Sequence, residues 1–577
     1  RAPSMTNSKF TNIAFDKDAI AAEAALEGKL GNWPVVYTIL GSHKVYVGET
    51  TNFEMRMRQH IDSGSKSDLS AVTVVLNDSF NKSACLDLES QLIKFLFADN
   101  QFKVLNGNSG IVNSDYFDRS AYQEEFDKIF AKLVEEKVLT RSINELINTD
   151  FFKYSPFKSL NTDQAIAVQH ILETIVTLRS SRSNPPFVIE GSPGTGKTIV
   201  AIYLMKLLAD IRDGNAVDVI DGESVFSELF IGENKSVLSK LQRVALVIPQ
   251  QSLRTSLKKV FEKTPGLEKK MVLSAFELAE APEPFDLVIV DEAHRLQRRA
   301  NQSSAMLNKK FTSANIALFG TDDKSKTQLD WVFKQSKQTI LLVDGLQAVK
   351  PADIPLATIE SLKATADANK TYFGLTNQMR VEGGNAYVDF VDDLLHGRAL
   401  DPKRDYGTYR LEVFDSVTAM REEILRLDSQ AGLSRLLAGY AWPWLSKSNP
   451  KQHDIEIDGL KLFWNRTAQD WINSATSVEE VGSIHTVQGY DLNYAGVIIG
   501  PDVSYDASAR RIVFNRENYF DAKGQENNPT LGLTFSDEDI REYVLNIYRV
   551  LLTRGIKGTF VHAVDPALQD YLRAAVG

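Results

Sequence analysis

A glycine-rich segment lies between an apolar run and a helix-like run, and its residue types and spacing could bind a nucleotide. Glycines let backbone N–H groups curl around a phosphate, and the N-terminus of the following helix adds about half a positive charge. A lysine at the helix start could reach the β- and γ-phosphates of ATP, and the next hydroxyl could hold Mg²⁺. The segment predicts a phosphate-binding loop made of Gly191, Gly194, Gly196, Lys197 and Thr198.

Two consecutive acids follow the strand-like run 287–290. A buried strand would deliver Asp291 to its C-terminal end, where the carboxylate could hold hydrated Mg²⁺ together with Thr198. Glu292 would then orient and deprotonate the water that attacks the γ-phosphate. Consecutive acids are often only a solvated loop, but their place after a buried strand favours catalysis. Phosphate binding, metal and base together predict ATP hydrolysis.

Several later segments, taken with Asp291-Glu292-Ala-His294, resemble the motifs of the superfamily-one helicases. This resemblance covers residues 156–577, and it is closest to a bacterial helicase family related to the helicase domain of Schlafen proteins. The matching segments are residues 160–164 (similar to the Q motif), 247–250 (the motif that touches a nucleic-acid backbone), 342–347 (motif III), 376–380 (motif IV), 484–491 (motif V) and 548–554 (motif VI).

The helicase resemblance implies a role for each polar residue of these motifs. Gln164 would read adenine, Gln347 would sense the γ-phosphate and couple it to the DNA site, and Gln488 would contribute to nucleotide binding. Arg380 and Arg554 would be arginine fingers that reach the γ-phosphate from a second domain. Such a finger is worth about 10³–10⁵ in rate and makes hydrolysis depend on domain closure. Singly, each arginine could also be an ordinary surface residue.

Aromatic residues cluster in segments 438–444 and 459–465, which also resemble the middle part of that helicase family. Such side chains could stack on bases, at about 1–3 kcal/mol each. The alternative interpretation is that they belong to a hydrophobic core. The sequence leaves both interpretations open.

A second group of residues near the N-terminus could cleave a phosphodiester. Arg56 and His60 are four residues apart on a predicted helix, so both could meet one phosphate. Glu89 lies on the otherwise apolar stripe of the next predicted helix, where a carboxylate is costly unless it is paired or binds a metal. The alternative is an Arg56–Glu89 ion pair, with Tyr37 and Tyr46 as ordinary strand residues.

Residues 35–37 and 45–48 resemble the paired half-motifs of the GIY-YIG nucleases, and residues 49–60 resemble the helix that follows them. The resemblance implies that a tyrosine phenolate or its bound water starts the attack, an arginine steadies the phosphate, and a glutamate anchors Mg²⁺ or Mn²⁺. The first half-motif has Val-Val-Tyr instead of Gly-Ile-Tyr, so an inactive binding module is an alternative. The implied site residues are Tyr37, Tyr46, Arg56, His60, Glu89 and Asn106.

Short apolar runs that alternate with helix-like runs predict the elements that position these side chains. The fold class is α/β: a small GIY-YIG-like domain followed by two RecA-like parallel-sheet domains. Strands are expected at residues 35–40, 44–48, 71–76, 187–190, 244–248, 287–290, 339–343, 496–499 and 559–563, and helices at 52–60, 83–97 and 199–208. The predicted divisions are an N-terminal extension (1–32), the nuclease-like domain (33–107), a helical connector (108–155), the first RecA-like domain (156–355), and the second (356–577) with an insertion around 395–480.

The amino-acid composition is typical of a soluble globular protein. The 577 residues are 43% hydrophobic and 24% charged, with a net charge of −10, which argues against a passive basic coat for DNA. A single cysteine, Cys85, and no signal or membrane segment predict a cytoplasmic protein with no membrane partner. The four residues before Met5 resemble an expression-vector remnant.

The combined hypothesis is an ATP-dependent helicase or translocase fused to a metal-dependent endonuclease. Its partner would be nucleic acid, with DNA favoured over RNA, and the fusion suggests defence against foreign DNA. One alternative is a nucleic-acid-sensing ATPase switch with an inactive nuclease module. Another is a P-loop kinase, although arginine and glutamine motifs spread over a second sheet disfavour it.

Overall fold

The computed structural model describes residues 8–64, 66–107, 119–178, 184–214, 226–299, 305–344, 350–378, 381–398, 405–467, 471–487 and 491–577. The chain divides into two compact units. The first contains Arg1–Arg179, Ile202–Gln242 and Leu257–Lys270, and the second contains Ser180–Ala201, Arg243–Ser256 and Met271–Gly577.

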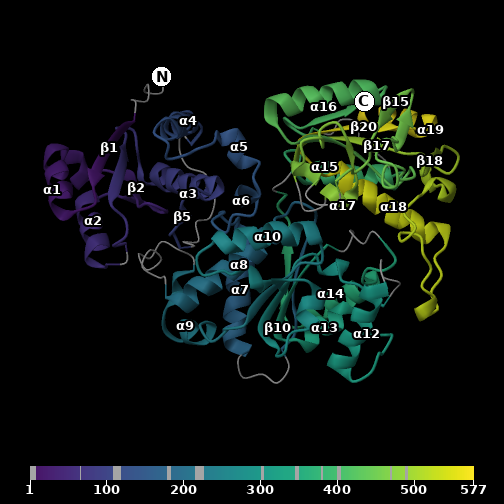
Figure 1. Cartoon of the computed structure of the whole chain (residues 1–577), viewed down its shortest axis with the longest axis horizontal. Helices are drawn as coiled ribbons and strands as arrows, with labels where there is room; N and C mark the ends of the chain where they lie inside the picture. The colour runs from purple at the N-terminus through teal and green to yellow at the C-terminus, as the bar shows by residue number, and fades with distance from the viewer. Residues whose placement is uncertain are drawn as a thin grey trace. The chain divides into compact units, whose positions relative to one another are not determined.

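A five-stranded sheet forms the N-terminal part of the first unit, in the order β1-β4-β2-β3-β5 (Figure 1). All neighbouring strands are antiparallel except β3 and β5. The strands predicted at residues 35–40 and 44–48 are confirmed and form a hairpin, in which Tyr37 pairs with Gly48. β1 lies before residue 33, where the sequence predicts this domain to begin. The strands are β1 (Lys9–Ala14), β2 (Val35–Leu40), β3 (Lys44–Thr50), β4 (Ala71–Leu76) and β5 (Lys103–Val104).

Two capped helices of this unit present the polar side chains of the predicted nuclease site. The Asn52 side chain accepts a hydrogen bond from the Met55 N–H at the start of α2, and Asn81 caps α3 through the Ala84 N–H. The helices predicted at residues 52–60 and 83–97 are confirmed. The helices are α1 (Lys17–Leu26), α2 (Phe53–Asp62), α3 (Lys82–Asp99), α4 (Arg119–Glu135), α5 (Ile143–Ile147), α6 (Asp150–Lys153), α7 (Thr162–Leu178) and α9 (Gly232–Leu238).

A six-stranded parallel sheet of the second unit follows the order β11-β6-β10-β9-β7-β8. The four strands predicted between residues 187 and 343 all lie in it. β11 also belongs to this sheet although it follows residue 355, where the sequence predicts the first RecA-like domain to end. The strands are β6 (Phe187–Gly191), β7 (Val244–Val247), β8 (Val272–Leu273), β9 (Phe285–Val290), β10 (Ser336–Val343) and β11 (Tyr372–Leu375).

Helices connect these strands in the way that a parallel sheet requires. Within the second unit, α14 contacts β6 and β11, α13 contacts β10, and α11 contacts β8. The helix predicted at residues 199–208 is confirmed, and it begins at Lys197. The helices of the second unit are α11 (Ala275–Ala279), α12 (Ala305–Phe319), α13 (Gln328–Lys334) and α14 (Leu356–Ala368). The division into units runs through α8 (Lys197–Asp213) and α10 (Gln251–Lys263), whose first residues belong to the second unit and whose later residues belong to the first.

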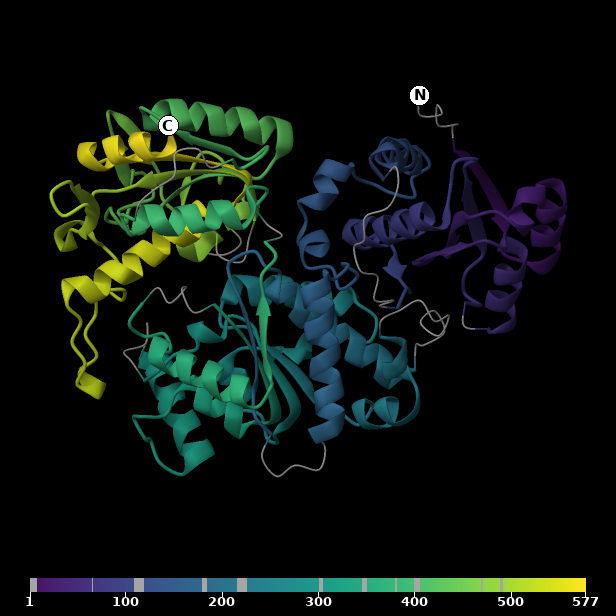
Figure 2. The same cartoon turned by 180° about the vertical axis from the view of Figure 1, so that it is seen from behind.

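A second parallel sheet lies toward the C-terminus, in the order β12-β20-β17-β13-β16. Figures 1 and 2 show α16 on one face of it and α15 and α18 on the other. The strands are β12 (Arg410–Val413), β13 (Ser434–Ala438), β16 (Val481–Gly482), β17 (Leu492–Ile499) and β20 (Gly555–Ala563). The helices are α15 (Gly384–Leu395), α16 (Val417–Ala431), α17 (Ile484–Val487), α18 (Asp537–Leu552) and α19 (Pro566–Val576).

These two parallel sheets confirm the predicted α/β class with RecA-like sheets. The insertion predicted around residues 395–480 contains β12 and β13, which are part of the second sheet, so the inserted segment is shorter and begins after β13. It carries the hairpin of β14 (Ile455–Ile457) and β15 (Leu460–Leu462). A further hairpin, β18 (Val503–Asp506) with β19 (Arg511–Phe514), follows β17. Of the aromatic residues in the insertion, Trp464 is buried in a core cluster, while Trp442 and Trp444 are half-buried against it.

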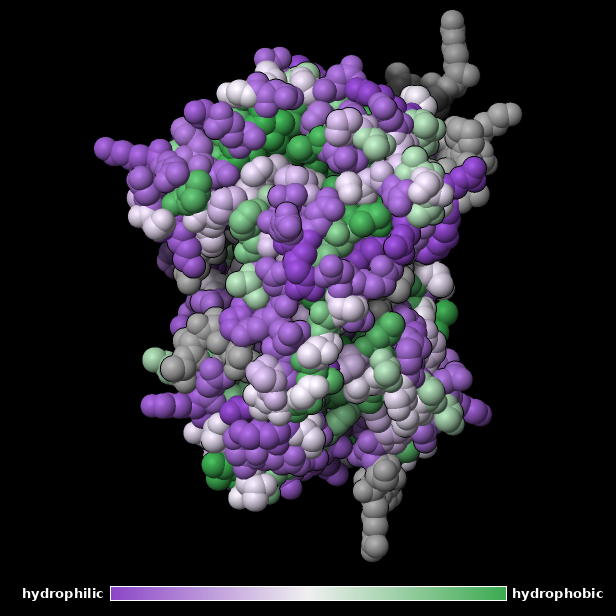
Figure 3. All heavy atoms as spheres, turned by 90° about the vertical axis from the view of Figure 1, so that its right-hand side faces the viewer, coloured by the Kyte–Doolittle hydropathy of each residue, from purple (hydrophilic) through white to green (hydrophobic). Residues whose placement is uncertain are grey.

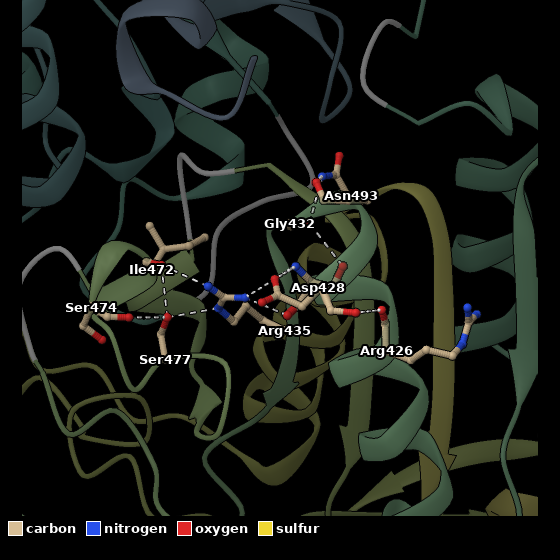
Figure 4. A network of polar contacts seen from close by, with 11 residues as sticks. Arg426, Asp428, Gly432, Arg435, Ile472, Ser474, Ser477 and Asn493 are labelled. Carbon is tan, nitrogen blue, oxygen red and sulfur yellow. Dashed lines mark hydrogen bonds and ion pairs between the residues drawn. The ribbon is translucent and has the colours of Figure 1, made fainter. Parts of the chain in front are cut away.

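A buried arginine ties the inserted segment to the second sheet (Figure 4). Arg435 on β13 is 7% exposed. Its Nη1 donates to Asp428 Oδ1 at 2.7 Å and its Nε donates to Ser477 Oγ at 3.0 Å. Asp428 belongs to α16, so one guanidinium joins the sheet, a covering helix and the insertion.

We expect Arg435→Ala to lower the free energy of unfolding of this region by about 3 kcal/mol, because it leaves Asp428 without its buried cationic partner. Arg426→Ala is the matched control, since Arg426 is on the same helix as Asp428 but is exposed and pairs with Glu423 on the surface. Differential scanning calorimetry would measure both. An equal loss of unfolding free energy in the two variants would show that the buried Arg435–Asp428 pair is no more important than the surface pair.

None of the helices among the described residues is long and apolar enough to cross a membrane. The face drawn in Figure 3 shows hydrophobic residues dispersed among hydrophilic ones. Exposed hydrophobic residues that occur singly need no functional explanation.

Candidate functional site

The predicted phosphate-binding loop connects β6 to α8, at the C-terminal end of a parallel strand where α/β proteins bind ligands. Gly194 and Gly196 have φ values of 88° and 79°, a region that favours glycine. A Cβ on Gly191 would lie 2.3 Å from Thr195 Oγ1, so a side chain there would have to displace Thr195. The backbone of the loop therefore favours glycine at positions 194 and 196.

Lys197 points back over the loop from the first turn of α8. Its Nζ donates to the carbonyl oxygens of Gly191 at 2.6 Å and Ser192 at 3.1 Å. The same ammonium lies 3.7 Å from Asp344 Oδ2, and both side chains are buried. Asp344, which follows β10, received no role from the sequence, although it lies within the segment that resembles motif III.

Thr198 and Asp291 meet although they are 93 residues apart, because β6 and β9 both end at this edge of the sheet. Thr198 Oγ1 donates to Asp291 Oδ2 at 2.6 Å. These are the two residues from which the sequence predicts a magnesium site. Mg²⁺ usually keeps several waters and is bound through one or two carboxylates plus substrate phosphates, so a hydroxyl with a single carboxylate suits it.

Glu292 adopts a left-handed backbone conformation with φ 53°, which is uncommon for a residue other than glycine. Its Oε2 lies 3.3 Å from His294 Nε2. The backbone N–H of Asp344 donates to His294 Nδ1 at 3.1 Å. Because Nδ1 accepts this hydrogen bond, a neutral His294 carries its proton on Nε2, facing the Glu292 carboxylate. His294 thus orients the candidate base, a role that a sequence pattern alone does not reveal.

Burial and the neighbouring Glu292 carboxylate raise the pKa of Asp291. Burial also opposes ionisation of Glu292, but the interaction with His294 and the positive charge of Lys197 outweigh it and lower the pKa of Glu292. The pKa values of the two adjacent acids therefore shift in opposite directions. Glu292 is held ionised, as a base must be, while Asp291 would gain from a cation beside it.

The other predicted nucleotide residues are placed as follows. Gln164 is buried at the start of α7, where its Oε1 accepts from the Asn161 N–H at 3.0 Å. Arg554 is buried between α18 and β20. Gln347, Arg380 and Gln488 lie outside the described residues.

Gln378, from the segment that resembles motif IV, contacts the phosphate-binding loop. Its Nε2 donates to the Pro193 carbonyl oxygen at 2.5 Å. The sequence assigned no role to this glutamine. Its place in a helicase-like motif was the available signal, and only the fold brings it beside a loop 185 residues away.

The predicted nuclease residues of the first unit form a cluster on β2, β3 and α2. Tyr37 Oη lies 2.8 Å from His60 Nε2. The Tyr37 and Tyr46 rings are 6.3 Å apart between centroids, and the Tyr46 and His60 rings are 5.1 Å apart. Lys66, which the sequence did not single out, lies 2.7 Å from His60 Nδ1 through its Nζ. These four side chains are buried.

The remaining nuclease candidates lie on neighbouring elements. Arg56 is half-buried and its Nη1 donates to Gln59 Oε1 at 3.2 Å. The Asn106 side chain pairs with the backbone of Val47, accepting from N and donating to O. That double hydrogen bond holds the segment after β5 against β3, a structural task for Asn106.

Glu89 and Glu49 both act on the buried Cys85 thiol. Burial, together with the negative charges of Glu49 and Glu89, raises the pKa of Cys85. Glu49 is also paired with Lys82, whose Nζ lies 2.7 Å from Glu49 Oε1. Within the described part of the chain, no three His, Cys, Asp or Glu side chains are grouped so as to hold a metal on their own.

Three comparisons with known proteins bear on the identity of the chain. A family model for the Schlafen group 3 DNA/RNA helicase domain matches residues 185–565. An uncharacterized protein of Saccharomyces cerevisiae is 26% identical over 400 residues, covering 67% of this chain and 83% of that protein. A chain in a solved S. cerevisiae complex of a Dbp5 variant with Nup159, a Gle1 variant, IP6 and ADP is 10% identical, with a TM-score of 0.23, covering 72% of this chain and 92% of that one.

The TM-score of the Dbp5 complex is too low to support a structural conclusion. The family model spans more than half of the 577 residues and includes the phosphate-binding loop, Asp291, Glu292 and both parallel sheets. The chain therefore belongs to the Schlafen group 3 DNA/RNA helicase family and carries that family's nucleotide-binding, helicase-like domain.

Proposed function

We propose that the chain hydrolyses ATP and uses the energy to move along, or remodel, nucleic acid, with DNA favoured over RNA. The observation that carries this proposal is the hydrogen bond from Thr198 of the phosphate-binding loop to Asp291, with Glu292 next in the chain and held by His294. An ionised base beside a buried carboxylate and a loop lysine is the arrangement that phosphoryl transfer to water needs.

Mg²⁺ fits this site, with Thr198 and Asp291 as the residues that would hold it. It would neutralise charge on the β- and γ-phosphates. Lys197 would exchange its loop carbonyls for phosphate oxygens, since an ammonium donates equally well to either. Glu292 would take the proton of the attacking water.

The remaining motif residues complete the proposed motor. Arg380 and Arg554 would approach the γ-phosphate as arginine fingers, Gln347 would sense it, and Gln164 and Gln488 would contribute to nucleotide binding. The proposed domains are the five predicted divisions, with β1 added to the nuclease-like domain and β11 to the first RecA-like domain. Hydrolysis that depends on fingers from a second sheet would couple each ATP to a step along the strand.

The nuclease-like domain would supply a second activity, metal-dependent cleavage of DNA. Its catalytic residues would be Tyr37, Tyr46, Arg56, His60 and Asn106, and Glu89 on α3 would anchor Mg²⁺ or Mn²⁺. A motor that feeds a nuclease suits destruction of foreign DNA in the cytoplasm, such as antiphage or restriction-like defence.

One observation favours a second candidate function. Tyr37, Tyr46 and His60 are buried, and the first half-motif lacks its glycine. A tyrosine that must touch a phosphodiester has to become exposed. An inactive domain that only binds nucleic acid, in an ATPase that acts as a sensor, is consistent with this burial.

Strand displacement separates the motor from the sensor. We expect the wild-type chain to displace a labelled strand from DNA in the presence of ATP and Mg²⁺. Lys197→Ala should lose this activity, because the phosphates of ATP would then lack the lysine as a cationic partner. Lys309→Ala is the control, since Lys309 is an exposed lysine of α12. ATP hydrolysis that is stimulated by nucleic acid but gives no displacement on DNA or RNA would support the sensor instead.

A further inference from the structure

Three buried polar side chains form a row in the nuclease-like domain, from Tyr37 on β2 through His60 on α2 to Lys66, which follows α2. Tyr37 Oη lies 2.8 Å from His60 Nε2, and His60 Nδ1 lies 2.7 Å from Lys66 Nζ. Tyr37 is 0% exposed, His60 3% and Lys66 7%. Lys66 also lies 3.7 Å from the centre of the Tyr46 ring, a cation–π contact. Lys66 is therefore held in place and is not a mobile surface lysine.

The hydrogen-bonding chemistry of the three groups fixes the direction of the row. A lysine ammonium has three donors and no acceptor, so His60 Nδ1 must accept from Lys66. A neutral imidazole then carries its proton on Nε2, and that proton points at Tyr37 Oη. In this arrangement the Tyr37 oxygen accepts a hydrogen bond from His60 and does not give its proton to His60.

Further observations support a neutral His60 and a fixed position of the Tyr37 phenol. Burial and the positive charges of Lys66 and Arg56 lower the pKa of His60 to about 3. Gly48, opposite Tyr37, leaves room for the phenol: a Cβ there would lie 2.3 Å from Tyr37 Oη. The Tyr37 ring is also fixed by Phe53, with centroids 6.1 Å apart. The phenol oxygen is thus held where His60 can donate to it.

We propose that Lys66 is a positioning residue of the nuclease-like domain, which holds His60 in the Nε2–H tautomer so that His60 donates to the Tyr37 oxygen. This inference rests on the proposed nuclease function. A donor aimed at a phenol oxygen stabilises negative charge there, as a general base requires. Lys66 acts through His60 and need not touch the substrate.

The tautomer of His60 can be measured without any nuclease activity. The full-length chain would be labelled with ¹⁵N-histidine, and the His60 signals would be assigned by their loss in His60→Gln. We expect the wild-type spectrum to show a neutral ring with a proton on Nε2 and a hydrogen-bond-accepting Nδ1, and Lys66→Met to change that pattern. Lys44→Met is the control, because Lys44 pairs with Asp68 on the exposed side of the same domain. A proton on Nδ1 in the wild type, or an unchanged pattern in Lys66→Met, would overturn the proposal.

Cleavage rates provide the second readout. We expect Lys66→Met to reduce plasmid cleavage about 10- to 100-fold, the usual cost of losing a group that orients a site residue. Lys66→Arg should recover much of the rate, since a guanidinium also only donates. A wild-type chain that does not cut DNA would refute the proposed nuclease while the spectrum still decides the tautomer. Full cleavage by Lys66→Met would refute the role of Lys66 alone.

Discussion

Replacing Glu292 with glutamine is expected to reduce the turnover of ATP by about 10²–10⁴-fold, the range for loss of a general base. Glutamine has nearly the same shape but cannot accept a proton from water at neutral pH. ATP binding should persist, because Lys197, Thr198 and the loop glycines are untouched. Steady-state phosphate release and equilibrium binding of a fluorescent ATP analogue would measure the two effects separately.

The matched control is Glu283→Gln, which removes an exposed carboxylate that pairs with Arg243 and precedes β9, at the opposite end of that strand from Asp291. It should hydrolyse ATP at the wild-type rate. If Glu292→Gln also keeps that rate, Glu292 is not the base. Loss of ATP binding together with hydrolysis would instead indicate that Glu292 maintains the site, through its left-handed backbone and His294.

Glu89→Gln is expected to reduce plasmid cleavage by more than about 10²-fold, because a neutral amide is a far weaker ligand for Mg²⁺ or Mn²⁺ than a carboxylate. Glu89 and Glu49 also contribute negative charge near Cys85, and together with burial they raise the pKa of its thiol. Agarose-gel assays of supercoiled plasmid with added Mg²⁺ would measure the effect, and EDTA should reproduce it in the wild type.

Glu124→Gln on α4 is the control for this experiment, since Glu124 is exposed in the same unit. It should cut as the wild type does. The ATPase activity of Glu89→Gln should stay at the wild-type level, because the residues proposed for hydrolysis lie in the helicase-like domain. Cleavage by Glu89→Gln at the full rate would remove the nuclease assignment and leave the binding-module alternative.

The phosphate-binding loop could be predicted because its chemistry is local. Its glycines, Lys197 and Thr198 are consecutive, and one strand and one helix suffice to place them. Strands β6, β7, β9 and β10 could also be predicted, since strands that are buried on both faces are continuously hydrophobic. Sequence therefore indicated the parallel sheets and the edge at which Asp291 would meet Thr198.

The limits of the domains could be predicted less accurately, for a physical reason. β1 and β11 are short strands whose membership in a sheet depends on partners far along the chain, β4 for β1 and β6 for β11. A strand pattern shows that a segment can pair but not with which neighbour. The predicted starts and ends at residues 33 and 355 consequently cut off strands that the sheets include.

The residues that hold other site residues in place could not be predicted, for the same reason. His294 is oriented by the backbone of Asp344, and Gln378 reaches the carbonyl of Pro193. Lys66 becomes significant only because the fold buries it beside His60 and Tyr46. Each contact joins a side chain to a group on another element, and residue spacing carries no information about it.

Stimulation of ATP hydrolysis by nucleic acid is the direct test of the proposed motor. The steady-state rate would be measured for the wild-type chain and for Lys197→Ala, with Mg²⁺ and with no nucleic acid, single-stranded DNA, duplex DNA or single-stranded RNA. We expect the wild-type rate to rise when DNA is added, and to rise more than with RNA, while Lys197→Ala stays at background. A wild-type rate that is unchanged by both DNA and RNA, or a Lys197→Ala rate equal to that of the wild type, would show that the chain is not such a motor.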